Sequence, residues 1–341
     1  DATLNSQTRG AGVGGDIDIR TANFSLSGNG SLNVSAFGAG DAGNIDIDGG
    51  VVTINDRGAL ILTASGSGTG GKLSLSATSL LLTDRAMITG TVSKEGNGDL
   101  LEFKTTDMKL QDRASITSNT IGSGAGGTID ISTTNFLIQE QASVKAETLS
   151  PGNGDAGLIK IATNQFQMVG GEIITNSISA GQGGTVDVQA TTILVSDGAA
   201  IKSDALSGGN GGNIELTASE SFKLSGASID AITRDRGTGG LILIESPTIE
   251  ILAQGRINIS ALSGIGDAGE LTLLGSTITL DKGNIGTATL TEGNAGTVTL
   301  IATNIDITGG GIQGETRGAG AGADILFTAD NISITDAPIN S

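Results

Sequence analysis

The chain has 341 residues, a formal net charge of −18, and neither cysteine nor histidine. This acidic balance argues against nucleic-acid binding, because phosphates require a basic face, and it disfavours anionic lipid surfaces. Without cysteine there is no disulfide or thiol chemistry, and without histidine the usual general base and a common metal ligand are missing. No apolar run approaches the roughly 20 residues of a membrane helix, so we expect no membrane insertion.

One unit, residues 126–157, shows how the chain is built. Apolar and polar residues alternate from Ile129, again from Phe136 and a third time from Val144, and a glycine-rich loop closes the unit. Such alternation is typical of half-buried strands. The unit is therefore expected to hold three short strands and no helix.

The unit recurs every 27 to 30 residues, most often every 28. The third strand continues its own series with Val144 and Ile174, and the second strand slips by one residue at Phe222. The first strand starts at an aliphatic residue in each of twelve units: Ile17, Ile45, Leu73, Leu101, Ile129, Ile159, Val186, Ile214, Ile242, Leu271, Val298 and Ile325.

A fixed period of this length predicts a solenoid, since one unit buries too few side chains to offset the entropy of ordering it, and only stacking closes that gap. We therefore expect an all-β fold, a right-handed parallel β-helix of about twelve 28-residue, three-strand coils, rising about 4.8 Å per coil. Residues 1–341 form a single domain in this interpretation. Both ends fall within a unit and neither resembles a cap, which suggests a segment of a longer chain or end-to-end self-association.

Glycine motifs offer one functional interpretation, which we set aside. The set Gly10-x-Gly12-x-x-Gly15 matches the dinucleotide-binding fingerprint, but that fingerprint must be followed by a helix whose N-terminus receives the pyrophosphate. Here a strand follows each match, so we interpret these glycines as corners of the coil. The other matches begin at Gly38, Gly66, Gly122, Gly152 and Gly264.

Acidic residues recur after the second strand, next to arginine in three successive coils. Stacking would place these carboxylates about 5 Å apart, the separation found in retaining glycosidases. The neighbouring arginines favour a different interpretation, a solvated ladder of ion pairs. The four dipeptides are Asp56-Arg57, Asp84-Arg85, Asp112-Arg113 and Glu140-Gln141.

Two further acidic sets were weighed as cation sites. Asp41, Asp155 and Asp267 lie in Gly-x-Gly-Asp-Ala-Gly loops, too many coils apart to share an ion. The outward positions of the first strand carry a second set, for which a solvated stripe is favoured over weak Ca²⁺ binding by oxygen ligands. We therefore predict no catalytic, cofactor-binding or metal-binding residue and no cofactor. The second set comprises Asp18, Asp46, Glu102, Asp130, Asp187 and Glu215.

Two stretches carry a family resemblance, GDAGNIDIDGGVVTINDRGALILTASGSGTGG (residues 40–71) and GGTVDVQATTILVSDGAAIKSDALSGGNGGNIEL (residues 183–216). They resemble the repeat region of filamentous haemagglutinin-like exoproteins, the large adhesins exported by two-partner secretion. The resemblance implies a β-helical shaft, an outer-membrane partner transporter for the parent protein, and a role in adhesion, aggregation or biofilm at the bacterial cell surface or outside the cell. The Asn-Pro motifs of the secretion domain are missing here.

We thus expect a structural or adhesive shaft that is not an enzyme, whose cell-surface or matrix receptor the sequence does not identify. A β-helical polysaccharide lyase or hydrolase is the alternative, but no turn exceeds its neighbours by more than a couple of residues, so no cleft wall is expected. A second alternative is a calcium-dependent binding module.

Overall fold

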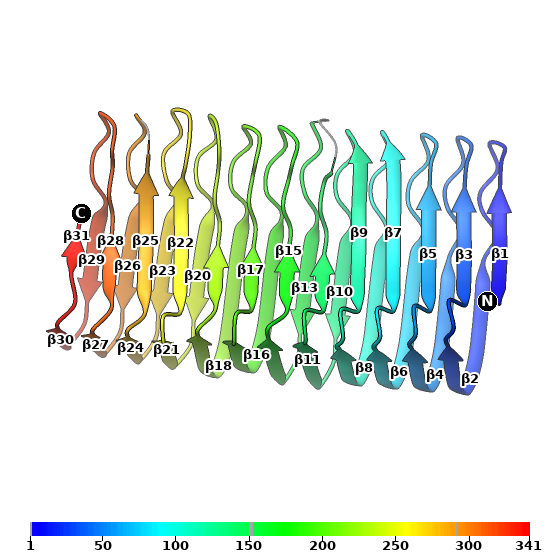
Figure 1. Cartoon of the computed structure of the whole chain (residues 1–341), viewed down its shortest axis with the longest axis horizontal. Coiled ribbons are helices and arrows are strands. Elements are labelled where there is room, and N and C mark those ends of the chain that lie inside the picture. Colours follow the sequence, from blue (N-terminus) through cyan, green and yellow to red (C-terminus); the bar gives the residue numbers. More distant parts are fainter. Residues whose placement is uncertain (1, 150–152, 291) are drawn as a thin grey trace.

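The computed structural model describes residues 2–149, 153–290 and 292–341, and these contain strands and turns but no helix. All strand pairs are parallel, and each strand pairs with its equivalent in the coil before and after it. In Figure 1 the near strands run upward and the far, fainter strands run downward as the chain advances from right to left, so the coil is right-handed. The all-β, parallel solenoid expected from the period is confirmed.

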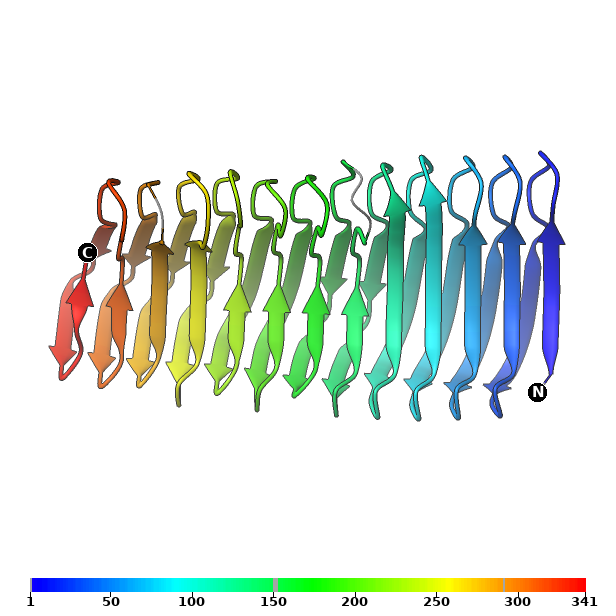
Figure 2. The same ribbon diagram turned by 45° about the horizontal axis from the view of Figure 1, so that its top comes forward.

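Sheet A is formed by the third strand of each coil and has 13 strands. Its strands differ in length along the rod (Figure 2), from eight residues in β7 and β9 to three in β12, β15, β17, β19 and β28 and two in β31. The strands are β1 (Thr3–Thr8), β3 (Ser31–Ala36), β5 (Ala59–Ala64), β7 (Met87–Lys94), β9 (Ser115–Gly122), β12 (Ser143–Lys145), β15 (Glu172–Ile174), β17 (Ala200–Lys202), β19 (Ser228–Asp230), β22 (Arg256–Ala261), β25 (Asn284–Thr289), β28 (Gly311–Gln313) and β31 (Ile339–Asn340).

Sheet B is formed by the first and second strands, which run together as one long strand in six coils and are separate in the others. The long strands are β2 (Ile17–Leu26), β4 (Ile45–Ile54), β6 (Lys72–Leu82), β8 (Leu100–Leu110), β16 (Thr185–Ser196) and β18 (Asn213–Ser225). The separate strands are β10 (Thr128–Ser132), β11 (Asn135–Gln139), β13 (Leu158–Ala162), β14 (Gln165–Val169), β20 (Leu241–Glu245), β21 (Thr248–Leu252), β23 (Glu270–Leu274), β24 (Thr277–Asp281), β26 (Thr297–Ile301), β27 (Asn304–Thr308), β29 (Asp324–Thr328) and β30 (Asn331–Thr335).

The register of sheet B agrees with the repeat read from the sequence. Each of the first eleven aliphatic starts pairs with the next, from Ile17 with Ile45 to Val298 with Ile325. The predicted slip at Phe222 is also present, as a register shift before the pair of Ile193 and Phe222.

One register prediction in sheet A is wrong. Val144 pairs with Ile173, and Ile173 with Ile201, so Ile174 is one residue out of register. The cause lies in the preceding turn, where a single residue, Gly170 (φ 68°), adopts the left-handed conformation. The previous coil uses two such residues at this turn, so the strand after Gly170 begins one residue earlier.

The interior is one continuous apolar cluster that runs the length of the rod, from Ile17 to Ile312. Columns of identical or similar side chains stack in it, and the rings of Phe136 and Phe166 lie 5.8 Å apart in neighbouring coils. Because each coil covers its neighbours' apolar faces, the stack supplies the burial that a single coil lacks.

Candidate functional site

The turns that lead from sheet B to sheet A carry the Asp-Arg dipeptides. Asp56 (φ 47°) and Arg57 (φ 63°) both adopt the left-handed conformation, and the Gly58 N–H donates to the Asn55 carbonyl at 2.8 Å. This is a type I′ turn, which glycine or asparagine forms most readily. Left-handed residues other than glycine cost roughly 1–2 kcal/mol each, so the Asp and Arg side chains are held at some expense of backbone free energy.

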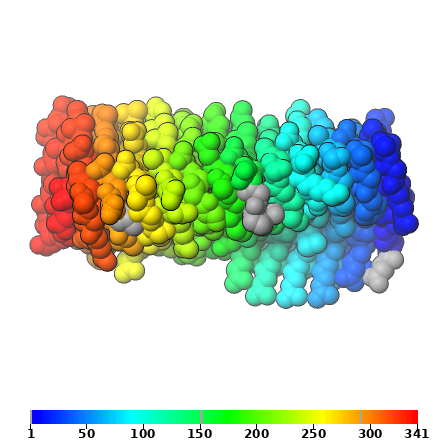
Figure 3. Space-filling model, turned by 90° about the horizontal axis from the view of Figure 1, so that it is seen from above, coloured from blue at the N-terminus to red at the C-terminus, as the bar shows by residue number. Residues whose placement is uncertain are grey.

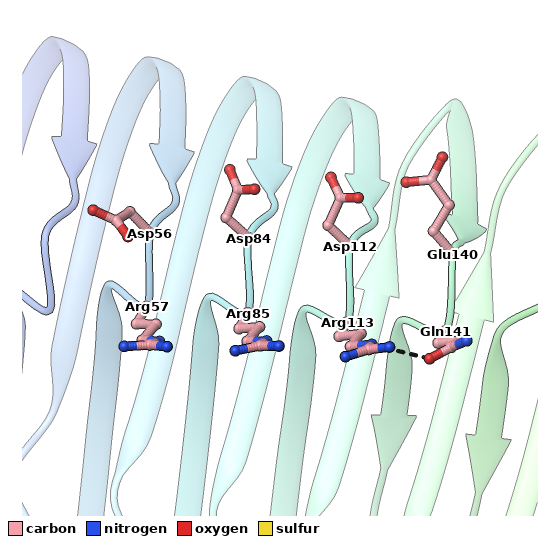
Figure 4. Close-up of a pocket in the computed structure, with 8 residues that line it drawn as sticks. All are labelled: Asp56, Arg57, Asp84, Arg85, Asp112, Arg113, Glu140 and Gln141. Carbon is pink, nitrogen blue, oxygen red and sulfur yellow. Dashed lines mark hydrogen bonds between the residues drawn. The ribbon is translucent and has the colours of Figure 1, made fainter.

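Three more turns repeat this geometry and stack on the first. The N–H groups of Arg57, Arg85 and Arg113 each donate to the next coil's acidic residue at its carbonyl, at 3.0 Å in all three cases. The side chains therefore form two parallel columns (Figure 4) along a groove of about 690 Å³. The acid column is Asp56, Asp84, Asp112 and Glu140, and the arginine column is Arg57, Arg85, Arg113 and Gln141.

The expected ladder of ion pairs is not formed. Five ion pairs occur among the described residues, and none includes a member of either column. Successive left-handed residues direct their side chains to different sides of the turn, which separates each carboxylate from the guanidinium beside it in sequence. In the arginine column, Arg113 Nε donates to Gln141 Oε1 at 3.0 Å (Figure 4).

Hydrogen bonds shift the pKa values of the two acids at the C-terminal end of the acid column, Asp112 and Glu140. The Thr83 hydroxyl donates to Asp112 Oδ2 at 2.7 Å, and this bond is the main cause that lowers the pKa of Asp112. The pKa of Glu140 is raised, chiefly by its side-chain hydrogen bond with Asp112. The opposed shifts belong to the pair, because a hydrogen bond between two carboxyls requires that one of them holds a proton.

The acidic set of the first strand faces outward on sheet B, as predicted. Its members are partly neutralised by basic neighbours: Arg20 Nη2 lies 3.0 Å from Asp18 Oδ2, and Lys72 Nζ lies 2.7 Å from Glu102 Oε2. Asp130 lies in register between Glu102 and Lys160. Within residues 2–149, 153–290 and 292–341, no group of three or more acidic residues is placed to hold a metal ion.

The acids of the Gly-x-Gly-Asp-Ala-Gly loops bind the backbone of the following coil. Asp41 Oδ1 accepts the Thr69 N–H at 2.7 Å and its hydroxyl at 2.8 Å, and these bonds lower the pKa of Asp41. Asp155 and Asp267 accept N–H groups in the same way. These carboxylates satisfy loop donors that no strand pairs with.

The glycines of the same loops lie where neighbouring backbones touch. A Cβ on Gly66 would lie 1.5 Å from the Gly38 carbonyl oxygen, and a Cβ on Gly38 would lie 1.9 Å from that of Gly10. The fingerprint matches are therefore explained by close packing of coil on coil. Of these matches, the one beginning at Gly152 starts outside the described residues.

Sequence reasoning missed one buried carboxyl. Asp99 occupies a column that holds glycine in ten of twelve coils, and its side chain lies inside the rod above Gly90. Oδ1 accepts the Gly71 N–H at 2.8 Å, while Oδ2 is buried with no hydrogen-bond partner. Burial raises the pKa of Asp99 to about 7.

At Asp99, glycine is missing from one column and present nine residues earlier, at Gly90. The same arrangement occurs at the only other position where this column lacks glycine. Ala323 replaces the glycine, and the residue nine positions earlier, Gly314, replaces a larger one. A Cβ on Gly314 would lie 2.1 Å from the Ala323 Cβ. The paired occurrence of an exception in one column and a glycine in the other is the signal by which the sequence could have revealed both sites.

A second buried acid, Asp204, lies two residues after β17, near the middle of sheet A. Asp204 Oδ1 accepts the Ile232 N–H at 2.8 Å, and burial raises the pKa of Asp204 to about 6. Next to it, Arg256 Nη2 lies 3.2 Å from Asp230 Oδ1. These side-chain bonds join neighbouring coils next to β17 and β19, which have only three residues each.

No described segment forms a helix long and apolar enough to cross a membrane. Comparisons of the chain with protein families, with curated proteins and with solved structures found no match.

Proposed function

We propose that this chain is a stiff, non-catalytic shaft, which holds a binding region away from a cell or assembles into a surface filament. The observation that supports this most is the unbroken stack of parallel coils around one continuous core. Nearest-neighbour stacking of this kind makes an extended body whose length is set by the number of coils.

The location and partners follow from the family resemblance and from the charge. The proposal places the chain outside the cell or on a bacterial surface, exported with the help of an outer-membrane partner transporter. Adhesion to a surface or matrix receptor, aggregation or biofilm formation are the corresponding roles. The net charge of −18 supports a protein that does not bind nucleic acid, and the lack of a long apolar run in the sequence supports one that does not insert into membranes.

The direct test is to remove whole coils and to measure how the shape and length of the particle change. Deleting residues 186–241 removes two coils and joins Thr185 to Ile242, which takes the place of its register equivalent Val186. We expect a folded rod shortened by about 10 Å, measurable by small-angle X-ray scattering, because the rise is about 4.8 Å per coil. A compact particle, or a deletion that unfolds the rest of the chain, would refute the shaft.

The groove gives the enzyme alternative its single supporting observation, the opposed pKa values of Asp112 and Glu140. A β-helical lyase or hydrolase would cleave an acidic polysaccharide, and cleavage would be lost in Asp112→Asn. We expect no turnover by the wild-type protein, since no loop insertion builds a cleft wall beside the groove to hold a sugar chain.

Calcium binding is tested separately. The acidic stripe of sheet B is the candidate surface, and a rise of many degrees in melting temperature with millimolar Ca²⁺ would favour a calcium-dependent binding module. Within the shaft proposal the melting temperature is expected to change little, because Lys and Arg already lie next to several of these acids.

A further inference from the structure

We propose that the groove is a self-complementary docking surface, through which two copies of this chain associate side by side, parallel and in register. This inference does not depend on the proposed function, because it rests on the arrangement of the two columns alone.

The columns set the symmetry of the pair. Both run along the rod, coil by coil, with the acids on one side of the groove and the guanidinium groups on the other (Figure 4). A two-fold axis parallel to the rod, placed between two facing grooves, exchanges the columns, so that each acid column faces the partner copy's arginine column. An antiparallel pair would place acid against acid and arginine against arginine. A two-fold interface of this isologous kind requires only one surface patch.

In the first two of the four turns, the side chains that would pair are free within one copy. Among the described residues, no hydrogen bond or ion pair engages the side chains of Asp56, Arg57, Asp84 or Arg85, and all four residues are exposed. Figure 3 shows a row of projections, coloured from blue to green, along one edge of the N-terminal half. The four turns belong to this part of the chain, and the exposure of the Asp and Arg residues in the first two turns leaves them accessible to a partner.

The spacing and charge favour a second copy over other partners. The groove carries four acids and three arginines, a net charge of −1, so a polyanion would meet four carboxylates beside the guanidinium groups. A suitable partner repeats both signs about every 4.8 Å, the rise of a parallel sheet, with the columns exchanged. Another copy of this chain meets both conditions by construction.

The association is expected to be weak and dependent on salt. Exposed ion pairs each contribute little, and two chains of charge −18 repel one another at low ionic strength. At physiological salt the screening length is about 8 Å, which reduces the long-range repulsion more than the contacts in the groove. We expect a Kd on the order of 0.1–1 mM, lowest at intermediate salt, in the range of transient interfaces.

The decisive experiment exchanges the charges of the columns. A basic variant carries Asp56→Arg, Asp84→Arg and Asp112→Arg, and an acidic variant carries Arg57→Asp, Arg85→Asp and Arg113→Asp. Each substitution changes the charge by two, so the net charges become −12 and −24, and their product, 288, stays close to the wild-type value of 324. Long-range repulsion in the mixture is thus nearly that of the wild type.

In sedimentation velocity at concentrations up to about 1 mM, we expect the wild type to dimerise and each variant alone to remain monomeric. The mixture should recover association to within about threefold of the wild-type Kd, since it restores the same number of opposite-charge pairs. A monomeric wild type, variants that dimerise alone, or a mixture that stays monomeric would each overturn the proposal. Circular dichroism melts verify folding, and the neutral triples Asp→Asn and Arg→Gln at the same positions, both expected to be monomeric, replace any variant that fails to fold.

The register is tested by disulfide trapping, which the absence of native cysteine makes specific. Parallel docking places residue 140 of one copy opposite residue 141 of the other. Mixed Glu140→Cys and Gln141→Cys chains should therefore cross-link roughly tenfold faster than Asp56→Cys mixed with Gln141→Cys, three coils out of register. Equal rates would contradict the register. Wild-type binding of polyglutamate that the acidic variant loses would assign the groove to polyanions and overturn the pairing.

Discussion

Two corners of the coil differ in what limits the residues at each: available space at one, backbone conformation at the other. At the glycine corner, the loop that leads from sheet A to sheet B, neighbouring backbones touch and space is the constraint, as the 1.5 Å approach at Gly66 shows. At the turn corner, which carries the acid and arginine columns, space is open and backbone conformation is the constraint, as the left-handed Asp84 and Arg85 show. Glycine occupies the positions where a side chain would collide, and in seven coils it is absent from the left-handed positions of the turn, where only conformation favours it. The turn corner therefore accepts a conformational cost, whereas the glycine corner cannot accept a collision.

The largest expected effect comes from filling the glycine corner. Gly66→Ala should lower the free energy of unfolding by more than about 4 kcal/mol, since the new Cβ would collide with the backbone oxygen of Gly38 and force two coils apart. Urea unfolding measures this. The matched control is Gly10→Ala in the same column, where no atom lies within 4 Å of the added Cβ. Equal stabilities of the two variants would show that the coils can separate at little cost.

Asp99 tests the one coil where the column two residues before the first strand holds a charged side chain. Its pKa is about 7 in the folded chain and 3.8 in the reference state, so the folded state binds the proton more tightly. The free energy of unfolding should therefore fall as pH rises from about 4 to 7, by up to about 4 kcal/mol, and be constant above pH 7 with respect to this group.

Asp99→Asn should abolish that part of the pH dependence. The double variant Asp99→Gly with Gly90→Ser should abolish it as well, because it reproduces the arrangement of Gly127 and Ser118 in the next coil. Urea titrations at pH 5 and pH 8 make the comparison. A wild-type slope that persists in both variants would assign the pH dependence to other groups.

The smallest expected effect concerns conformation at the turn corner. Arg85→Gly should raise the free energy of unfolding by about 0.5–1 kcal/mol, because relief of the left-handed conformation outweighs the added entropy of the unfolded chain. Arg85→Ala keeps the left-handed strain and should leave stability nearly unchanged. Thermal melts of both variants decide this, and a destabilised Arg85→Gly would mean that the arginine stabilises the single rod.

The repeat was predictable because both of its signals are local. Alternation of period two places side chains inward, and the 28-residue spacing places Ile129 above Leu101 without any knowledge of the turns. The register at Ile173 was not predictable from hydrophobicity, since Ile173 and Ile174 are equally apolar. The choice between them depends on how many left-handed residues the preceding turn contains.

The candidate site was located from the sequence, but its interactions were not. Stacking of Asp84 on Asp112 follows from the period, whereas the absence of ion pairs follows from the directions of two successive left-handed side chains. Asp99 escaped detection for a different reason. Its partner Gly90 lies in the preceding third strand, so each residue looks like an isolated exception until the fold brings them together.

The pairing of Asp99 with Gly90, and of Ala323 with Gly314, fixes what can be exchanged between coils. Each pair spans the glycine corner, because its two members belong to the third strand of one coil and the entry to the next. Duplication or recombination with a junction in that loop would separate the two members of a pair. Asp99 or Ala323 could then face a residue with a side chain where it now faces glycine. A junction at the turn corner transfers both together. The unit that is duplicated or exchanged is therefore expected to run from one turn corner to the next. Its boundaries differ from those of the coil described above, which begins at the first strand.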